Sequence, residues 1–516
     1  MRKSRILTVF LALAVAFAIP AGPGLYVADA ATNGTAISTA DDLKAMEKNP
    51  SGNYYLKNDI EVTGNIQLFK DRKNPFKGTL DGNSHKITYK YTAARYVADV
   101  ALFGNTEGAT FKNLSISVDI NMTGGGNAAG LVENSKNGKF ENIKTSGSIK
   151  IKNRGTEDDD CCNAVGIVAY ESASGTIKNC ANSIDIELTH KGQSAPTASG
   201  IAGIVGKGSV TKCTNKGKIA LTHTPDKDWG SSECEAAGIV GAYYGTKAIS
   251  GCKNSGKISI TGTKATEAYG FAPKAAGIAV ISDANIVSCS NTATISINNN
   301  ASGNRGAEAA GIACEAAHIG TKVSKCSNSG AISYTGKPAG GIDIVTVAGV
   351  VCSAAKAEQT YNKGKVSVNS KIKADAGGIA GFCADMRNCY NTGAVTHKGT
   401  GNAGGLAATA TVIGGYVKGN YSTGKVGGNS SSKLFKGQLI GFYSGGFDVM
   451  KRNIYNNYYK TSGKAYGAAD FTWKPWLAKA TKVSSITAKN CPALSSKYWT
   501  YSSKYKRMIL KNNKEK

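Results

Sequence analysis

An internal repeat constrains the fold of this chain more than any other feature. The segment Ala237–Gly262, which reads AGIVGAYYGTKAISGCKNSGKISITG, represents it, and related copies recur from about Ala101 to the C-terminal region. Equivalent positions are 29 to 39 residues apart. A period in this range is typical of solenoids and repeat arrays. The chain must therefore build most of its fold by stacking one kind of unit.

The copies align on one column of mostly small or apolar residues. A Gly followed by an apolar residue precedes the column, and an Asn-x-Gly-x-Ile or Asn-x-Gly-x-Val motif follows it, as in Asn215–Ile219. In a solenoid, equivalent positions stack on successive rungs, about 4.8 Å apart, so we predict that the column is a buried core ladder. The column is Leu114, Ile143, Cys180, Cys213, Cys252, Cys289, Cys326, Thr360, Cys389 and Asn420.

The pattern within each copy indicates strands rather than helices. Three short apolar runs, such as Ile239–Val240, Ile249–Cys252 and Ile258–Ile260, alternate with polar residues at period two and are separated by Gly, Asn and Ser. No copy holds the ten or more residues of helical periodicity that a helix pair requires. We therefore predict an all-β parallel β-helix with three strands per coil. The Asn of each Asn-x-Gly motif should adopt left-handed backbone angles and stack its amide on the next rung.

The repeat unit resembles the GLUG motif of bacterial secreted and surface proteins. The segments Ile37–Leu43, Asn53–Ile60 and Phe76–Asn83 are similar to the usual opening of that group. The resemblance implies a right-handed parallel β-helix of about ten coils with terminal caps, and an adhesin-like role. In some immunoglobulin-A-cleaving metallopeptidases the repeat precedes a catalytic domain with a zinc-binding His-Glu-x-x-His motif. None of the five His residues here lies in such a motif, so the resemblance does not extend to peptidase activity.

The start of the chain has the pattern of a secretory signal peptide. Basic residues precede an apolar run, Ile6–Ile19, and a small-x-small cleavage motif, Ala28–Ala30. We predict cleavage after residue 30; an uncleaved anchor is the alternative. There is no Cys beside the cleavage site and no C-terminal sorting motif. The mature protein is therefore expected to be secreted or non-covalently attached to the cell surface, with no transmembrane segment.

The remaining chain divides into three predicted parts. Residues 31–100 form an N-terminal cap, in which Ser38 or Thr39 caps a short helix that runs through Met46. Tyr54–Val62 and Thr79–Tyr91 are its candidate strands. Residues 101–459 form the β-helix, and residues 460–516 form a C-terminal cap. The alternative to a simple cap is that the aromatic residues of this segment form a sugar-binding platform. These residues are Trp473, Trp476, Tyr498, Trp499 and Tyr501.

Net charge points to the class of partner. The chain carries a formal charge of +27. Removal of the signal peptide takes away Arg2, Lys3, Arg5 and Asp29, three positive charges and one negative, and leaves +25. Such a surplus favours contact with a polyanion or acidic glycan of a cell wall or host. The alternative is that the lysines only keep the surface soluble. Export and the lack of a nucleic-acid motif argue against nucleic acid, and a monomer is expected.

Thirteen Cys residues in an exported chain would ordinarily indicate disulfides. The six Cys of the core ladder, however, share their column with Leu114, Ile143 and Thr360 and are expected to pack as small apolar residues. Cys314 and Cys352 form a second, shorter ladder. Stacked thiols match neither disulfide geometry nor a tetrahedral metal site, so no metal or other cofactor is predicted. Cys161, Cys162 and Cys234 lie elsewhere, and a bond from Cys234 to one of the other two is the candidate disulfide.

Acidic residues concentrate in segments predicted to be variable loops that precede the Gly-apolar elements. If the register is correct, they gather along one edge of the β-helix, where pectate-lyase-like enzymes hold calcium and an acidic sugar. A solvated acidic edge is the simpler interpretation. The candidate ligand edge consists of Glu157, Asp158, Asp159, Asp160, Asp226, Asp228, Glu233 and Glu235, and Glu267 and Glu308 occupy similar segments.

No catalytic residue is predicted. His190, His223 and His397 each follow the third apolar run of a copy, so a shared place in the repeat explains them better than catalysis does. The chain has no G-x-S-x-G motif, phosphate loop or metal motif. We therefore expect an exported, non-enzymatic, adhesin-like binding protein, with a polysaccharide lyase or hydrolase that uses the acidic edge as the alternative.

Overall fold

The computed structural model describes most of the chain after the predicted signal peptide. The described residues are 34–153, 162–192, 194–225, 232–263, 271–301, 305–316, 318, 320–336, 344–411, 415–429, 433–444, 453–469 and 479–515. Residues 1–30, the predicted signal peptide, lie outside these ranges.

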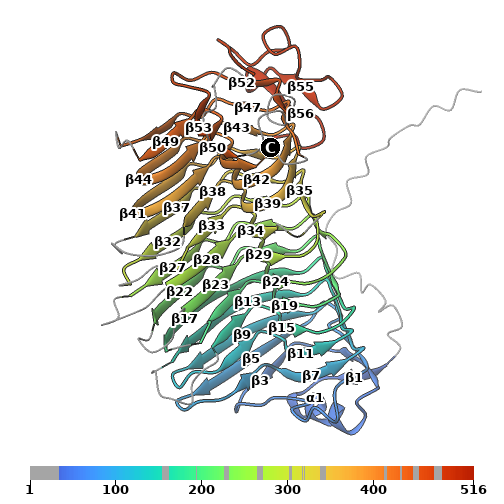
Figure 1. Ribbon diagram of the computed structural model, residues 1–516. Coiled ribbons are helices and arrows are strands. Elements are labelled where there is room, and N and C mark those ends of the chain that lie inside the picture. The colour runs from blue at the N-terminus through green and yellow to red at the C-terminus, as the bar shows by residue number, and fades with distance from the viewer. Residues whose placement is uncertain are drawn as a thin grey trace, which may run out of the picture. The chain divides into compact units, whose positions relative to one another are not determined.

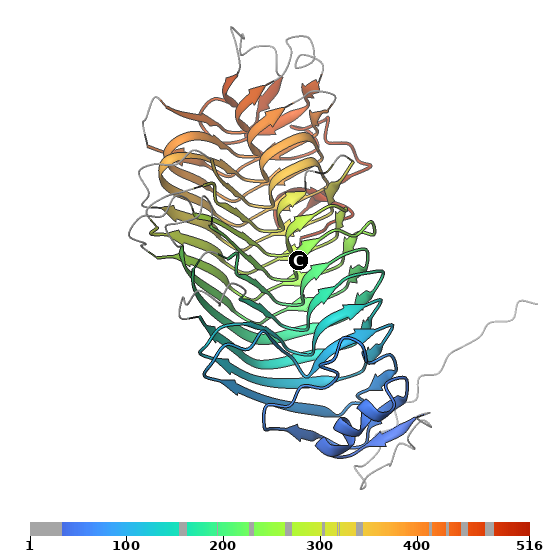
Figure 2. The same ribbon diagram turned by 60° about the horizontal axis from the view of Figure 1, so that its bottom comes forward.

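The described residues between Gly34 and Lys482 form a parallel β-solenoid of about ten turns with almost no helix (Figures 1 and 2). Within the described residues, the two sheets of the solenoid have 24 and 30 strands, and the chain passes from one to the other in every coil. The pairings between coils are all parallel and follow the repeat register. The predicted parallel β-helix is confirmed. No helix in the described ranges is long and apolar enough to cross a membrane.

The coil around Cys252 illustrates the repeat. It consists of β23 (Ser232–Ala237), β24 (Val240–Tyr243), β25 (Ile249–Ser250), β26 (Lys253–Asn254) and β27 (Ile258–Gly262). The strands β24 and β25 belong to one sheet, and β23, β26 and β27 belong to the other. The three predicted apolar runs fall near β24, β25 and β27. The prediction of three strands per coil is wrong, because β23, in the segment taken for a variable loop, and β26, directly after Cys252, are additional strands.

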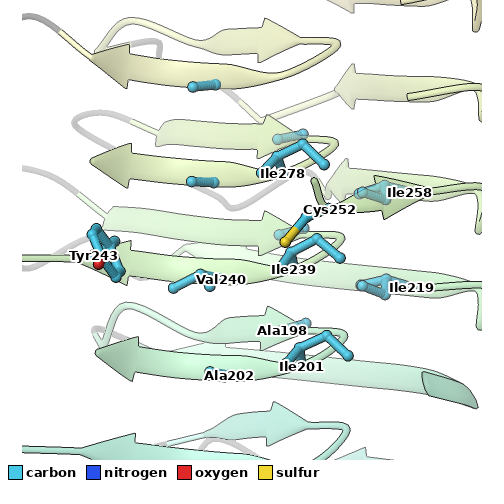
Figure 3. Packing of buried hydrophobic residues seen from close by; sticks show 14 of the residues in the cluster. Ala198, Ile201, Ala202, Ile219, Ile239, Val240, Tyr243, Cys252, Ile258 and Ile278 are labelled. Carbon is cyan, nitrogen blue, oxygen red and sulfur yellow. The ribbon is translucent and has the colours of Figure 1, made fainter. Parts of the chain in front are cut away.

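The column residues lie in the core that both sheets enclose. All ten are between 0% and 1% exposed. Figure 3 shows Cys252 pointing into this core beside Ile239 of the preceding corner, with Ile258 on the following strand. The thiols donate to nearby carbonyls, as Cys252 Sγ does to Ser250 O at 3.5 Å. They therefore occupy the interior as small residues whose polar atom has a local partner.

A ladder of Asn amides runs beside the thiol column. From Asn182 to Asn362, each Nδ2 donates to the Oδ1 of the Asn on the next rung over 2.7–2.9 Å, which confirms the predicted stacking. The predicted left-handed backbone is wrong for these residues. The positive φ angles belong to the residue before the column, as in Lys212 (φ 55°) and Ser288 (φ 55°), because the chain turns between the sheets there. The Asn ladder is Asn182, Asn215, Asn254, Asn291, Asn328, Asn362 and Asn391.

At the other corner of each coil, formed by the Gly-apolar element, there is no space for a Cβ atom. A Cβ atom on Gly277 would lie 2.2 Å from the carbonyl oxygen of Gly311 on the next rung and 2.9 Å from the side chain of Asn291. Both distances are below van der Waals contact. The Gly of the Gly-apolar element therefore allows successive coils to approach closely at this corner.

The N-terminal region contains the predicted short helix, α1 (Ala40–Ala45), followed by a 3₁₀ turn, Met46–Lys48. Thr39 caps α1 and exchanges backbone–side-chain hydrogen bonds with Asp42, so the predicted cap is confirmed. Each of the two candidate strands is divided in two by a turn. The strands of this region are β1 (Thr35–Ile37), β2 (Asn53–Leu56), β3 (Ile60–Val62), β4 (Thr79–Asp81) and β5 (Lys86–Ala93).

The C-terminal segment folds back along the side of the last coils. Its antiparallel strands, β55 (Trp499–Ser502) and β56 (Arg507–Leu510), cover a stack of Tyr361, Tyr390 and Tyr421, whose neighbouring ring centroids are 4.9 Å apart. Trp499 packs on this stack and is only 1% exposed, so it is not available as a sugar platform. Trp473 and Trp476 lie outside the described residues.

The parallel coils extend past residue 460, the predicted start of the C-terminal cap. Strand β53 (Tyr466–Ala469) pairs in parallel with β50 (Ile440–Ser444). Strand β54 (Ala480–Lys482) pairs in parallel with β52 (Asn457–Tyr459). The folded-back segment therefore begins after Lys482.

Candidate functional site

The candidate site lies at the glycine corner, where two columns of outward-facing side chains come together. One column belongs to strands that end at this corner, and Figure 1 shows several of them stacked as rungs. These are β18 (Thr197–Ser199), β23, β28 (Phe271–Ala276), β33 (Glu308–Ala310), β38 (Val345–Ala348), the ends of β41 (Val366–Gly377) and β44 (Val395–Gly404), and β49 (Leu434–Gly437).

The second column belongs to the strands that begin after the corner. These are β19 (Ala202–Val205), β24, β29 (Ala279–Ser282), β34 (Ala313–Ala316), β39 (Val351–Glu358), β42 (Ala380–Arg387), β45 (Ala407–Thr411) and β50. In register, the first column reads Thr197, Glu235, Lys274, Glu308, Thr346, Asp375, Asn402 and Phe435. The second column reads Ile204, Ala242, Ile281, Glu315, Ser353, Phe382, Thr409 and Phe442.

Toward the C-terminal coils the two columns enclose a groove with a volume of about 530 Å³, which we call the corner groove. Its apolar walls include Phe382 and Phe435, which are 37% and 40% exposed, and Phe442, whose ring centroid is 6.1 Å from that of Phe435. Lys373 and Lys433 also line it. Exposed aromatic faces beside fixed polar groups are typical of ligand sites.

A buried carboxylate fixes the polar part of the corner groove. Oxygen Oδ1 of Asp375 accepts from the backbone N–H of Asn402 at 3.2 Å and from its Nδ2 at 3.0 Å, and Oδ2 accepts from Thr409 Oγ1 at 2.9 Å. Burial raises the pKa of Asp375, although these hydrogen bonds oppose the rise. The network holds the amide and hydroxyl in place, so they can orient a ligand without reorganisation.

The preceding rungs carry an ionic cluster of Glu235, Lys274, Glu308 and Glu315. Lys274 Nζ forms an ion pair with Glu315 Oε1 at 2.8 Å, and this pair raises the pKa of Lys274 although burial opposes the rise. Burial, with the nearby Glu315 charge, raises the pKa of Glu308 to about 7. Burial also raises the pKa of Glu235. One lysine thus offsets the charge of several partly buried carboxylates.

Two thiols lie beside this ionic cluster. Cys314 Sγ donates to Ala275 O at 3.4 Å, and Cys352 Sγ donates to Ala309 O at 3.3 Å. They follow the corner on successive rungs, outside the core that contains the Cys252 column, and pack among the small residues of the corner. The sulfur atoms and a carboxylate oxygen of Glu308 lie within 4.8 Å of one another.

The acidic edge predicted from the sequence is only partly described. Glu157, Asp158, Asp159, Asp160, Asp226, Asp228 and Glu267 lie outside the described residues, and so does Cys161. Glu233 and Glu235 lie on strand β23 rather than in a loop; Glu233 is exposed, and Glu235 joins the ionic cluster. Cys234 on the same strand is a buried free thiol, so no disulfide joins it to another cysteine among the described residues.

Three of the histidines are buried and contact other groups of the solenoid interior. Nδ1 of His190 and Nδ1 of His223 are 2.9 Å apart, and their rings stack in the interior. His397 Nε2 lies 2.7 Å from Ala374 O and is also buried. His85, at the surface, lies 3.6 Å from Asp59. These contacts fit the predicted shared place in the repeat.

Sequence reasoning missed the corner groove. Phe382, Phe435 and Asp375 were not singled out, because their strands were not recognised as forming a common corner. The available signal was the alternation of small buried residues with large or polar ones on either side of the Gly-apolar element, as in Ala374–Gly377.

Comparison with known proteins gives limited information. No family model matches the chain, and no curated protein matches it. Among solved structures, one similar chain is a Bacteroides ovatus protein proposed to be an immunoglobulin A1 protease. It is 11% identical, the match covers 93% of this chain and 95% of that one, and the TM-score is 0.19.

Proposed function

We propose that this protein is an exported, non-enzymatic, adhesin-like surface protein that binds an anionic glycan in the corner groove. The observation that carries the proposal is the exposed aromatic wall of Phe382 and Phe435 together with Lys373 and Lys433. An aromatic face packs against the apolar face of a sugar ring, and lysines attract its acidic groups. The hydrogen-bonded side chains of Asn402 and Thr409 supply polar partners for hydroxyl groups.

Three features of the sequence support the biological setting of this proposal. The N-terminal signal-peptide pattern supports export, the repeat unit supports membership of the GLUG-motif proteins, and the charge of +25 after signal cleavage supports attraction to a polyanion. We further propose that the mature protein is a monomer held at the cell surface without a covalent link.

Binding to immobilised polygalacturonate, heparin and purified cell walls tests the proposal. We expect Phe435→Ala and Lys373→Gln each to weaken binding by about tenfold, which corresponds to about 1.4 kcal/mol. The matched controls are Tyr501→Ala, an exposed aromatic on β55, and Lys257→Gln, an exposed lysine outside the groove. Equal effects of site and control variants, or no binding to any of these polymers, would contradict the proposal.

The alternative proposal, a polysaccharide lyase or hydrolase, predicts a different outcome of the same assay. An enzyme would shorten the polymer, with or without added calcium, and would release new chain ends. We expect the wild-type protein to retain the polymer at constant length. Depolymerisation by the purified wild-type protein would favour the enzyme.

A further inference from the structure

Three side chains capable of binding a metal lie together at the glycine corner. Glu308 comes from β33, Cys314 from β34 and Cys352 from β39. Their ligand atoms, one carboxylate oxygen and two sulfurs, all lie within 4.8 Å of one another. Across the residues that the structure describes, no other group of three His, Cys, Asp or Glu side chains meets this distance.

The carboxylate of Glu308 lacks a full set of partners. Its Oε2 atom is buried and accepts no hydrogen bond from any described residue. An unsatisfied buried carboxylate oxygen is costly, and a cation would satisfy it. The nearby ammonium of Lys274 already forms its 2.8 Å ion pair with Glu315. The closest fixed positive charge is thus shared among several carboxylates and leaves this oxygen unpaired.

The two thiols are placed to share the same ion. Cys314 and Cys352 are 0% and 1% exposed, and their sulfurs hydrogen-bond to backbone carbonyls at 3.3 Å or longer and to each other. Glu308 is the partly exposed member of the group, and both thiols are buried. Two stacked thiols alone do not surround a tetrahedral ion. Here Glu308 supplies a third ligand from β33, which lies on the other side of the corner.

We propose that Glu308, Cys314 and Cys352 form a binding site for a thiophilic divalent cation of the Zn²⁺ class. Thiolate and carboxylate ligands together suit Zn²⁺, and ligand atoms around a tetrahedral zinc are roughly 3.3–3.8 Å apart. The three side chains must therefore close by only about 1 Å. Three protein ligands leave a fourth position for water or for a donor group of a bound molecule.

The site adjoins the corner groove. Cys352 Sγ also donates to the backbone carbonyl of Thr346 at 3.3 Å, and the side chain of Thr346 lines the groove. A cation here would add positive charge next to the proposed glycan site. The metal proposal nevertheless rests on its own three residues, and it holds or fails independently of glycan binding.

Cadmium titration of the reduced, metal-free mature protein tests the site, since a cadmium–thiolate bond gives an ultraviolet charge-transfer band. We expect the wild-type protein to bind a single Cd²⁺ ion through two thiolates, and native mass spectrometry to show the added ion. Cys binds a metal as the thiolate, so binding must displace protons and should weaken as the pH falls. Zn²⁺ should displace Cd²⁺ competitively.

The variants separate this site from other thiols. The double variant Cys314→Ser, Cys352→Ser should lose the band, and Glu308→Gln should weaken Cd²⁺ binding by about tenfold or more. The control Cys289→Ala removes a buried thiol of the core ladder and should leave the affinity unchanged, with circular dichroism verifying the fold of each variant. The absence of a band in the wild-type protein, its persistence in the double variant, or an unchanged affinity in Glu308→Gln would overturn the proposal.

Discussion

At the scale of single residues, this fold stabilises buried polar groups by repeating them. Asn254 is 1% exposed, yet its amide donates to Asn291 and its oxygen accepts from Asn215. Each Asn is satisfied because the next coil supplies the same residue. The stacking could be predicted from the repeat alone. The backbone angles could not, because a turn with several Asn, Ser, Gly and Lys residues does not reveal which of them takes the left-handed conformation.

Replacement of one ladder residue should therefore affect two rungs. Asn254→Ala removes one acceptor from the Asn215 amide and one donor from the Asn291 oxygen, and we expect the free energy of unfolding to fall by about 2–4 kcal/mol. Chemical denaturation measures the change. The control Asn121→Ala, at an exposed position of β9 (Ser115–Met122), should change stability by less than about 0.5 kcal/mol. Equal losses in both variants would refute the ladder's contribution.

His223 should make stability depend on pH. Burial, with the neighbouring His190, lowers the pKa of His223 from 6.5 to about 3. In the unfolded chain it would be protonated below about pH 6.5, so the unfolded state binds more protons between these values and stability falls as the pH drops through this window. From pH 7.5 to 4.5 the loss from this residue should be about 2–3 kcal/mol.

The test compares denaturation of the wild-type protein and His223→Asn at the two pH values. The variant should lose less stability on acidification than the wild type. An identical pH dependence in His223→Asn and the wild type would show that the buried imidazole does not titrate as inferred.

At the scale of elements, the corner between β28 and β29 determines both stability and the site. The close approach of coils at Gly277 brings the outward columns of two sheets together, so Glu308 and Glu315, from strands on either side of the corner, both lie near Lys274. The strands that enter this corner were predicted as loops. The Ala- and Glu-rich sequences of β23 and β33 lack the β-branched residues that usually mark a strand, and pairing with neighbouring coils overrides that weak local preference.

Gly277→Ala should destabilise the solenoid because a methyl group would meet the Gly311 carbonyl at 2.2 Å. We expect a loss of about 2–3 kcal/mol, typical of overpacking a closely packed site. Gly427, in β48 (Val426–Gly428), is the matched control, since a Cβ there meets no atom within 4 Å. A thermal melt in which Gly277→Ala unfolds with the same midpoint as Gly427→Ala would contradict this account of the corner.

At the scale of the whole molecule, the repeat period and inner pattern were sufficient to predict the parallel β-helix and the buried position of its core column. They were insufficient for the candidate site. The corner groove depends on which outward side chains occupy equivalent positions on successive rungs. Asp375, Asn402 and Phe435 can be aligned with one another only when the register across β41, β44 and β49 is known. Coil lengths vary from 29 to 39 residues, so sequence spacing alone does not give that register.

The large positive charge offers a competing explanation for any binding to a polyanion. A chain of this charge would attract such a polymer over its whole surface, and that attraction would fall steeply with salt. The groove account instead requires a local site whose aromatic contacts persist as salt rises. Retention of the polymer at high salt should therefore be lost in Phe435→Ala but kept in Tyr501→Ala.

Lysine footprinting distinguishes these explanations most directly. The protein is acetylated with and without the anionic polymer it retains, and mass spectrometry measures the modification of each lysine. We predict that Lys373 and Lys433 in the corner groove become protected while Lys257 stays reactive. Uniform protection of all lysines, or protection confined to lysines outside the groove, would contradict the central claim that the corner groove is the binding site.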